Sequence, residues 1–168
     1  MSTVSATTEG GSASLVRSIT IAALVIAIVN GLDQTAFAVL TQHVTPMIVF
    51  QYFASALLGL AAFAGGYTTA LLGLLIHVVV SFVVAGVFIL AASNIAFLRR
   101  TVFVSALVYG VAVAFISGVV LPFTAAPKVP TTPLAMVHGL VADALFIGLP
   151  LAFVVWQGAR ARGASVPA

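Results

Sequence analysis

The sequence predicts an all-α polytopic membrane protein: a four-transmembrane-helix bundle with one additional external helix, interfacial or re-entrant. Of its 168 residues, 62% are hydrophobic and only 5% are charged, and the mean hydropathy is +1.29. Four stretches have the roughly 20 apolar residues needed to cross about 30 Å of hydrocarbon. A fifth apolar stretch fits better outside the bundle, because of the way the basic residues are distributed.

The four predicted spans cover residues 19–41, 68–92, 101–123 and 134–157. A proline-rich loop over residues 125–133 separates the last two spans, since proline has no backbone donor and does not continue a helix.

The stretches outside the spans predict two tails. Residues 1–16 are rich in Ser, Thr and Gly, which predicts a disordered N-terminal tail. Residues 17–157 then form the transmembrane domain, and residues 158–168 form a cytoplasmic tail.

The number of spans depends on residues 46–64, which are apolar and uncharged. Basic residues favour the cytoplasmic side of a membrane. With four spans, one face carries five arginines and the other carries a single lysine: Arg17, Arg99, Arg100, Arg160 and Arg162 against Lys128. With five spans, four of the arginines would lie opposite Arg17 and Lys128. We therefore expect four spans, both termini in the cytoplasm, and residues 46–64 as a helix at the outer face.

The first span also has features of a signal peptide. Arg17 precedes an apolar run, and Ala36-Phe37-Ala38 has the small-residue pattern of a cleavage site. However, Asn30, Asp33 and Gln34 interrupt the run before that site, and apolar residues resume after it. The pattern favours an uncleaved first helix.

Composition excludes several classes of function. The chain has no cysteine, which rules out disulfides, thiolate metal sites and cysteine nucleophiles. The net charge of +3 comes from basic residues scattered at the ends of the spans, which indicates topology rather than nucleic-acid binding. Phosphate-binding, dinucleotide-binding, nucleophile-elbow and zincin patterns are all absent, so no enzyme activity and no cofactor are expected.

Three ionisable residues stand inside the apolar spans: Asp33, His77 and Asp143. A charged side chain at the centre of a membrane helix costs about 2.5–3.5 kcal/mol, so such residues usually have a function. A rise of about 1.5 Å per residue places all three some 4–5 Å outward of the middle of their spans. They are predicted to form one buried polar layer.

Polar neighbours at helical spacing extend this layer. Asn30 and Gln34 flank Asp33 on the first span, and Ser81 lies one turn from His77 on the second. In the third span the candidates are Ser105, Tyr109 and Ser117, and His138 near the outer end of the last span is a weaker candidate. We expect a polar or ion-binding site built from Asp33, His77, Asp143, Asn30, Gln34 and Ser81, with weaker contributions from His138 and Tyr109.

Three alternative roles for these residues remain open. The polar side chains can simply hold helices together through interhelical hydrogen bonds, which are worth about 0.6 kcal/mol each in membranes. A haem between His77 and His138 is disfavoured by a difference in depth of about 6–7 Å. A divalent metal held by Asp33, His77 and Asp143 would have suitable ligand types, but no helix carries a closely spaced pair of ligands.

Several motifs resemble an uncharacterised family of small four-span bacterial inner-membrane proteins, and more distantly YagU-like proteins. The resemblance covers most of residues 19–157 and rests on these stretches: Gly31-Leu32-Asp33, Gln51, Ala54-Ser55-Ala56-Leu57-Leu58-Gly59, Ala62-Phe63-Ala64-Gly65-Gly66, Leu72-Gly73-Leu74-Leu75-Ile76-His77, Tyr109-Gly110, Val120-Leu121-Pro122 and Gly148-Leu149-Pro150. It implies the four-span fold and a bacterial inner-membrane location, and it implies no activity.

The leading hypothesis for function is ion, proton or small-solute handling through the buried Asp/His layer, that is, a transport-type role. The alternative is a non-transport accessory or scaffold membrane subunit whose polar groups only hold its helices together. In either case we expect the partners to be the lipid bilayer and a second copy or another membrane protein.

Overall fold

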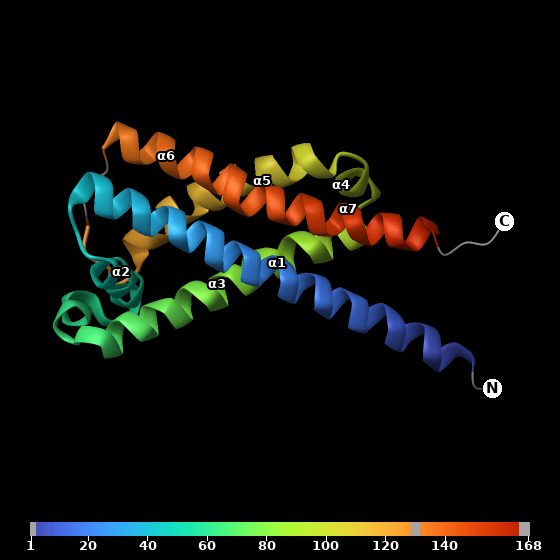
Figure 1. Ribbon diagram of the computed structural model, residues 1–168, viewed down its shortest axis with the longest axis horizontal. Coiled ribbons are helices and arrows are strands. Elements are labelled where there is room, and N and C mark those ends of the chain that lie inside the picture. Colours follow the sequence, from blue (N-terminus) through green and yellow to red (C-terminus); the bar gives the residue numbers. More distant parts are fainter. Residues whose placement is uncertain (1–2, 129–131, 165–168) are drawn as a thin grey trace.

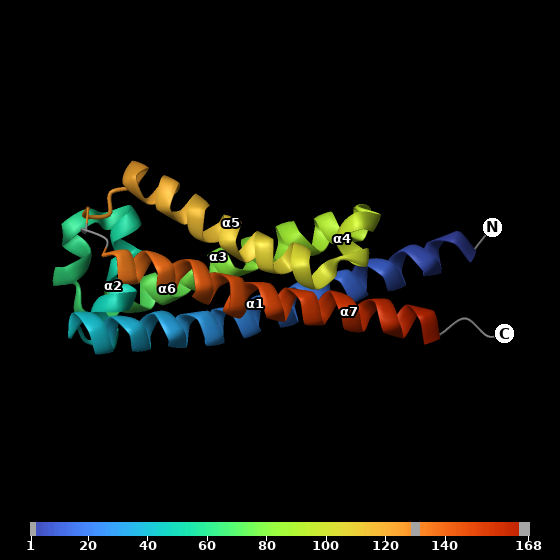
Figure 2. The same ribbon diagram turned by 90° about the horizontal axis from the view of Figure 1, so that it is seen from above.

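The computed structural model describes residues 3–128 and 132–164, which are almost entirely helical and contain no strand. Four long helical runs lie lengthwise, and both chain ends emerge at the same end of the molecule (Figure 1, Figure 2). The runs are α1 (Thr3–Gln42), α3 (Gly66–Asn94), α5 (Val102–Val120), and α6 (Pro133–Asp143) continued by the π-helix η3 (Ala144–Gly148) and α7 (Leu149–Ala164). The all-α prediction is confirmed.

Five helical stretches among the described residues are long and apolar enough to span a membrane. They are Ala13–Gln42, Pro46–Ala64, Gly66–Asn94, Val102–Phe123 and Pro133–Arg160. Four of them contain the predicted spans, and the fifth is the stretch for which an external helix is predicted. The fold is therefore that of an all-α polytopic membrane protein.

The fifth stretch is bent into two short helices, α2 (Pro46–Leu58) and the 3-10 helix η1 (Gly59–Ala64). Gly59 ends α2 with a φ of 58°, a conformation that glycine adopts without strain. Both helices lie at the end of the molecule opposite the two chain ends, where α2 occupies the space between the diverging ends of α1 and α3 (Figure 1). The prediction that residues 46–64 are helical is confirmed, with a bend at Gly59.

Gln51 links α2 to the start of α3 through hydrogen bonds. Its side chain is 1% exposed and its amide nitrogen donates to the carbonyl oxygen of Gly66 at 3.0 Å and to the hydroxyl of Thr69 at 3.3 Å. Ser55 shares the buried face, as the four-residue spacing predicts, but its hydroxyl bonds within α2 to the carbonyl of Tyr52. The face of α2 that carries Gln51 and Ser55 therefore packs inside the protein.

Small side chains set the contact between α1 and α3 nearer the other end of the molecule. The hydrophobic core includes Ala22 and Ala23 of α1 with Ala85 and Ala92 of α3, and all four are fully buried or nearly so. Such residues let membrane helices approach closely. From this contact the two helices diverge toward the end that holds α2 (Figure 1).

A short helix not predicted from the sequence, α4 (Ala96–Arg100), joins α3 to α5. Its Arg99 side chain donates to the carbonyl oxygens of Ala92 at 3.0 Å and Ser93 at 2.6 Å. These belong to the last turn of α3, whose carbonyls have no intrahelical partner, and a basic group there also complements the helix dipole. Arg99 thus caps α3 at the end of the molecule that carries the chain termini.

The fourth predicted span is capped at its start and is interrupted by a π-helix before a proline. Thr132 caps the start of α6, where its hydroxyl accepts from the backbone N–H of Ala135 at 3.2 Å. Further along, Pro150 lies inside the helix, without a backbone donor and with a ring that would clash with the carbonyl four residues earlier. The chain widens into η3, Ala144–Gly148, just before this proline.

The disordered N-terminal tail expected over residues 1–16 differs from the structure, in which α1 begins at Thr3. The stretch has no proline, and extending an existing helix adds one hydrogen bond for each residue that is ordered. The apolar span therefore continues backward as helix. At the other end, α7 extends to Ala164, so most of the expected tail over residues 158–168 is also helical, and its last four residues lie outside the described residues.

Candidate functional site

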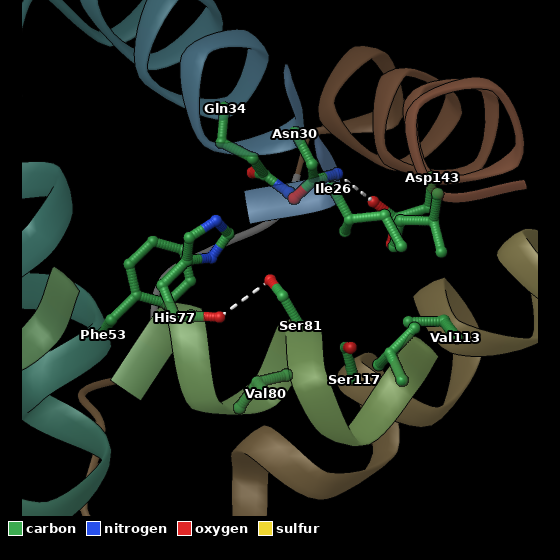
Figure 3. Close-up of a pocket in the computed structure, with 12 residues that line it drawn as sticks. Ile26, Asn30, Gln34, Phe53, His77, Val80, Ser81, Val113, Ser117 and Asp143 are labelled. Atoms are coloured by element: carbon green, nitrogen blue, oxygen red, sulfur yellow. Dashed lines mark hydrogen bonds between the residues drawn. The ribbon is translucent and has the colours of Figure 1, made fainter. Parts of the chain in front are cut away.

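A cavity of about 90 Å³ lies inside the bundle between α1, α3, α5 and the α6–η3 helix, next to α2 (Figure 3). Six polar or ionisable side chains line it: Asn30, Gln34, His77, Ser81, Ser117 and Asp143. The rest of the wall is apolar: Ile26, Phe53, Val80, Val84, Val113 and Ile147. One water needs roughly 10–15 Å³ of such space, so the cavity has room for several waters.

A buried hydrogen bond between α1 and α6 forms one wall. The Asn30 amide nitrogen donates to Oδ1 of Asp143 at 2.8 Å, and the two residues are 5% and 7% exposed. The bond is drawn in Figure 3. The ionisable carboxyl of Asp143 is therefore held in place by the neutral amide of Asn30, which is 113 residues away in the chain.

His77 forms the opposite wall on α3. Its Nε2 lies 3.1 Å from the carbonyl oxygen of Ala27, which only accepts, so Nε2–H is the donor. Gly31 makes this reach possible, because a Cβ there would lie 3.0 Å from Nε2. On its other side the ring packs against Phe53 of α2, with centroids 5.0 Å apart. The ring is thus fixed between α1 and α2.

Several polar groups on the wall have no hydrogen bond to any part of the chain that the structure describes. These are Oδ2 of Asp143, Nδ1 of His77, the Gln34 amide and the Ser117 hydroxyl. Ser81 differs from them, since its hydroxyl donates to the carbonyl of His77 in its own helix at 2.9 Å. The cavity therefore offers donors and acceptors that a water or small polar solute can satisfy.

Asp33 does not line this cavity with His77 and Asp143 and instead contacts His138. Nε2 of His138 lies 3.3 Å from both carboxylate oxygens of Asp33, and the hydrogen bond is to Oδ1 of Asp33. Oδ2 is buried and has no hydrogen bond among the described residues. Phe37 stacks on the imidazole, with centroids 3.8 Å apart and an angle of 11° between the ring planes.

The reason for this separation lies in helix geometry. Asn30 and Asp33 are one turn apart on α1, and each faces a different turn of the antiparallel helix α6. The position of a residue along its span predicts its depth in the membrane. Depth alone does not predict which residue of a neighbouring helix it contacts. The spacing of His138 and Asp143 on one helix is the sequence signal that points to a second pair.

The remaining candidates are distributed as follows. Ser117 and Val80 line the cavity and are both exposed, so the cavity reaches the protein surface between α3 and α5. Tyr109 instead donates to the carbonyl of Val84 at 2.9 Å and links α5 to α3. Ser105 is hydrogen-bonded to Thr101 at 2.8 Å, away from the cavity.

The haem site and the metal site considered from the sequence are not assembled. His77 and His138 belong to separate contacts, with Ala27 and with Asp33, rather than to one axial pair. Within residues 3–128 and 132–164, no three His, Asp or Glu side chains are grouped closely enough to hold a metal ion. The donors that do meet are a carboxyl, an imidazole, amides and hydroxyls, which suit protons, water and small polar solutes.

Comparison of the chain with protein-family models, with curated proteins and with solved structures finds no match. What the chain shows by itself is a set of apolar helices of membrane-spanning length around a cavity with unsatisfied polar groups.

Proposed function

We propose that the chain crosses a bacterial inner membrane four times, with both termini in the cytoplasm and with α2 and η1 at the outer face. Support comes from the length of α2, whose 13 residues extend only about 20 Å. The helix also bends at Gly59 and stays at the end where α1 finishes and α3 begins (Figure 1). The arginines of α4 and α7 and the lysine before α6 are then arranged as the positive-inside rule requires.

Single-cysteine labelling tests this topology without background, since the chain has no cysteine. Phe97→Cys in α4 and Leu60→Cys in η1 form a matched pair, because the native side chains are 67% and 74% exposed. An impermeant maleimide added to intact cells is expected to label position 60 and to label position 97 only after lysis. Labelling of position 97 in intact cells would contradict four crossings and favour five.

We further propose that the protein moves protons or a small polar solute through the cavity. The observation that carries this proposal is the set of unbonded polar groups around the Asn30–Asp143 hydrogen bond. A buried carboxyl costs free energy in a membrane, and a purely structural one would be expected to have all its hydrogen bonds satisfied within the protein. Free acceptors on Asp143 and His77 are instead available to a transient occupant.

Flux in proteoliposomes tests this function. With an internal pH dye and an imposed membrane potential, wild-type protein is expected to carry protons, and Asp143→Asn to reduce the rate about tenfold or more. The amide keeps a group that can pair with Asn30 but removes the exchangeable carboxyl proton. Tyr109→Phe is the matched control, because its hydroxyl bonds to Val84 and not into the cavity. Equal rates for wild type and Asp143→Asn would overturn the proposal.

The second candidate, an accessory or scaffold subunit, is favoured by the outer half of α5. Residues 115–120 are all exposed, and Phe115, Ile116 and Val119 are each more than half exposed. Such a helix end has room for a partner helix from a second copy or from another membrane protein. Wild-type protein that carries no flux but self-associates in nanodiscs would favour this candidate over transport.

A further inference from the structure

Two polar contacts lie in series along the line where α1 meets α6. Asn30 pairs with Asp143, and one turn further along α1, Asp33 pairs with His138. Asp33 is closer than Asn30 to the end of α1 at Gln42, and α2 begins at Pro46, so the Asp33–His138 pair lies nearer to α2.

The Asp33–His138 pair has the features of an exchange site rather than a simple helix contact. The imidazole is partly exposed, and its stacking on Phe37 holds the ring in place. Oδ2 of Asp33 is buried and unused by any hydrogen bond among the described residues. Asp33 therefore has one carboxylate oxygen hydrogen-bonded to His138 and a second, buried oxygen that has no hydrogen bond among the described residues.

We propose that Asp33 and His138 form a proton-exchange pair that loads Asp143 from the α2 end of the bundle. This inference rests on the proposed function and names its substrate as the proton. In the first transfer an N–H bond of the His138 imidazolium breaks and an O–H bond forms on Asp33. In the second, Asp33 gives up a proton to water, and water delivers one to the Asp143 carboxylate. Each transfer breaks one bond to hydrogen and forms one. Asp33 is again a carboxylate after the second transfer, and His138 returns to the imidazolium form when it takes a proton from water.

The titratable groups around this path are few. Among the described residues, the charged groups that act on Asp143 are Asp33 and His138. His77 of α3 faces the same cavity, Tyr109 of α5 is bonded to Val84, and α2 carries Tyr52. The chain has only two aspartates and three histidines, so labelled amino acids report on individual sites.

Hydrogen–deuterium exchange of the Asp143 carboxyl tests the path without requiring transport. Protein labelled with 13C-aspartate is placed in nanodiscs, and the infrared C=O band is followed after transfer to D2O at a pH where Asp143 is protonated. Asp143→Asn identifies its band. Asp33→Asn and His138→Asn are each expected to slow exchange at Asp143 about tenfold or more. The double variant should be no slower than the singles, because both residues serve one step.

His43→Asn is the matched control, since His43 lies in the loop after α1 and asparagine tolerates its φ of 56°. It is expected to leave the exchange rate unchanged, and circular dichroism verifies that each variant keeps its helices. An unchanged exchange rate at Asp143 in both Asp33→Asn and His138→Asn would overturn the proposed exchange pair. The absence of an infrared band of protonated Asp143 in the wild-type protein between about pH 4 and 8 would also overturn it. Absent flux with slowed exchange in the two variants would instead reject the transport proposal while retaining the pair.

Discussion

Gly73→Ala is expected to detach α2 from the bundle. A Cβ at this position of α3 would overlap the backbone carbonyl of Phe50 and press on the backbone of Ala54, both in α2. Backbone atoms of a packed helix do not move aside as a flexible side chain would, so the overlap is relieved only by separating the helices. Overpacking of this kind costs about 1–3 kcal/mol or more, and Gln51 would lose its contacts with α3 at the same time.

The measurement is the free energy of unfolding in bicelles or detergent, combined with maleimide labelling of single cysteines on the buried face of α2. Gly86→Ala is the control on the same helix, because a Cβ there meets nothing within 4 Å. It is expected to change stability by no more than about 0.5 kcal/mol. Equal stability of the two variants would show that α2 does not pack against α3 as closely as the structure has it.

Gly110→Ala is expected to have the second largest effect and to act on the candidate site directly. A Cβ at Gly110 would overlap the backbone carbonyl of Asp143 and the start of η3. Separating α5 from this segment moves Asp143 away from Asn30, so a loss of about 1–3 kcal/mol in stability should be accompanied by a loss of proton flux. The flux and unfolding assays are made on the same preparation.

Gly118→Ala provides the comparison for that variant. It lies two turns further along α5, where a Cβ meets nothing within 4 Å. Both stability and flux are expected to remain at the wild-type level. A Gly110→Ala protein with reduced stability and full flux would mean that the position of Asp143 relative to Asn30 does not control transport.

Much of the fold could be predicted from hydropathy and charge because each long helix is specified locally by its own apolar run. The α2 helix could also be predicted, since Pro46 begins it and Gly59 ends it. Helix α4 could not, because its boundaries depend on Arg99 reaching back to carbonyls of α3. The π-helix could not be predicted either. It depends on Pro150 together with close packing against α5, and hydropathy carries no information about that packing.

The sequence predicts how deep each residue of the candidate site lies in its span, but it does not predict which residues contact one another. Burial of His77 and Asp143 follows from their apolar surroundings, and both line the cavity. Which carboxyl faces the cavity depends on rotation about the helix axis, which the sequence specifies only through packing against neighbours. For that reason depth alone groups Asp33 with His77, although Asp33 pairs with His138.

The crossing of α1 and α3 has a mechanical consequence. Their alanine contact fixes the distance between the two helices at one level, and α2 fixes it again at the end of the molecule where it packs. The wall residues Asn30 and His77 lie along the chain between these two levels, so the width of the cavity follows the angle between the helices. Helix tilt responds to bilayer thickness. We therefore expect the accessibility of Asp143 to change with the thickness of the surrounding bilayer.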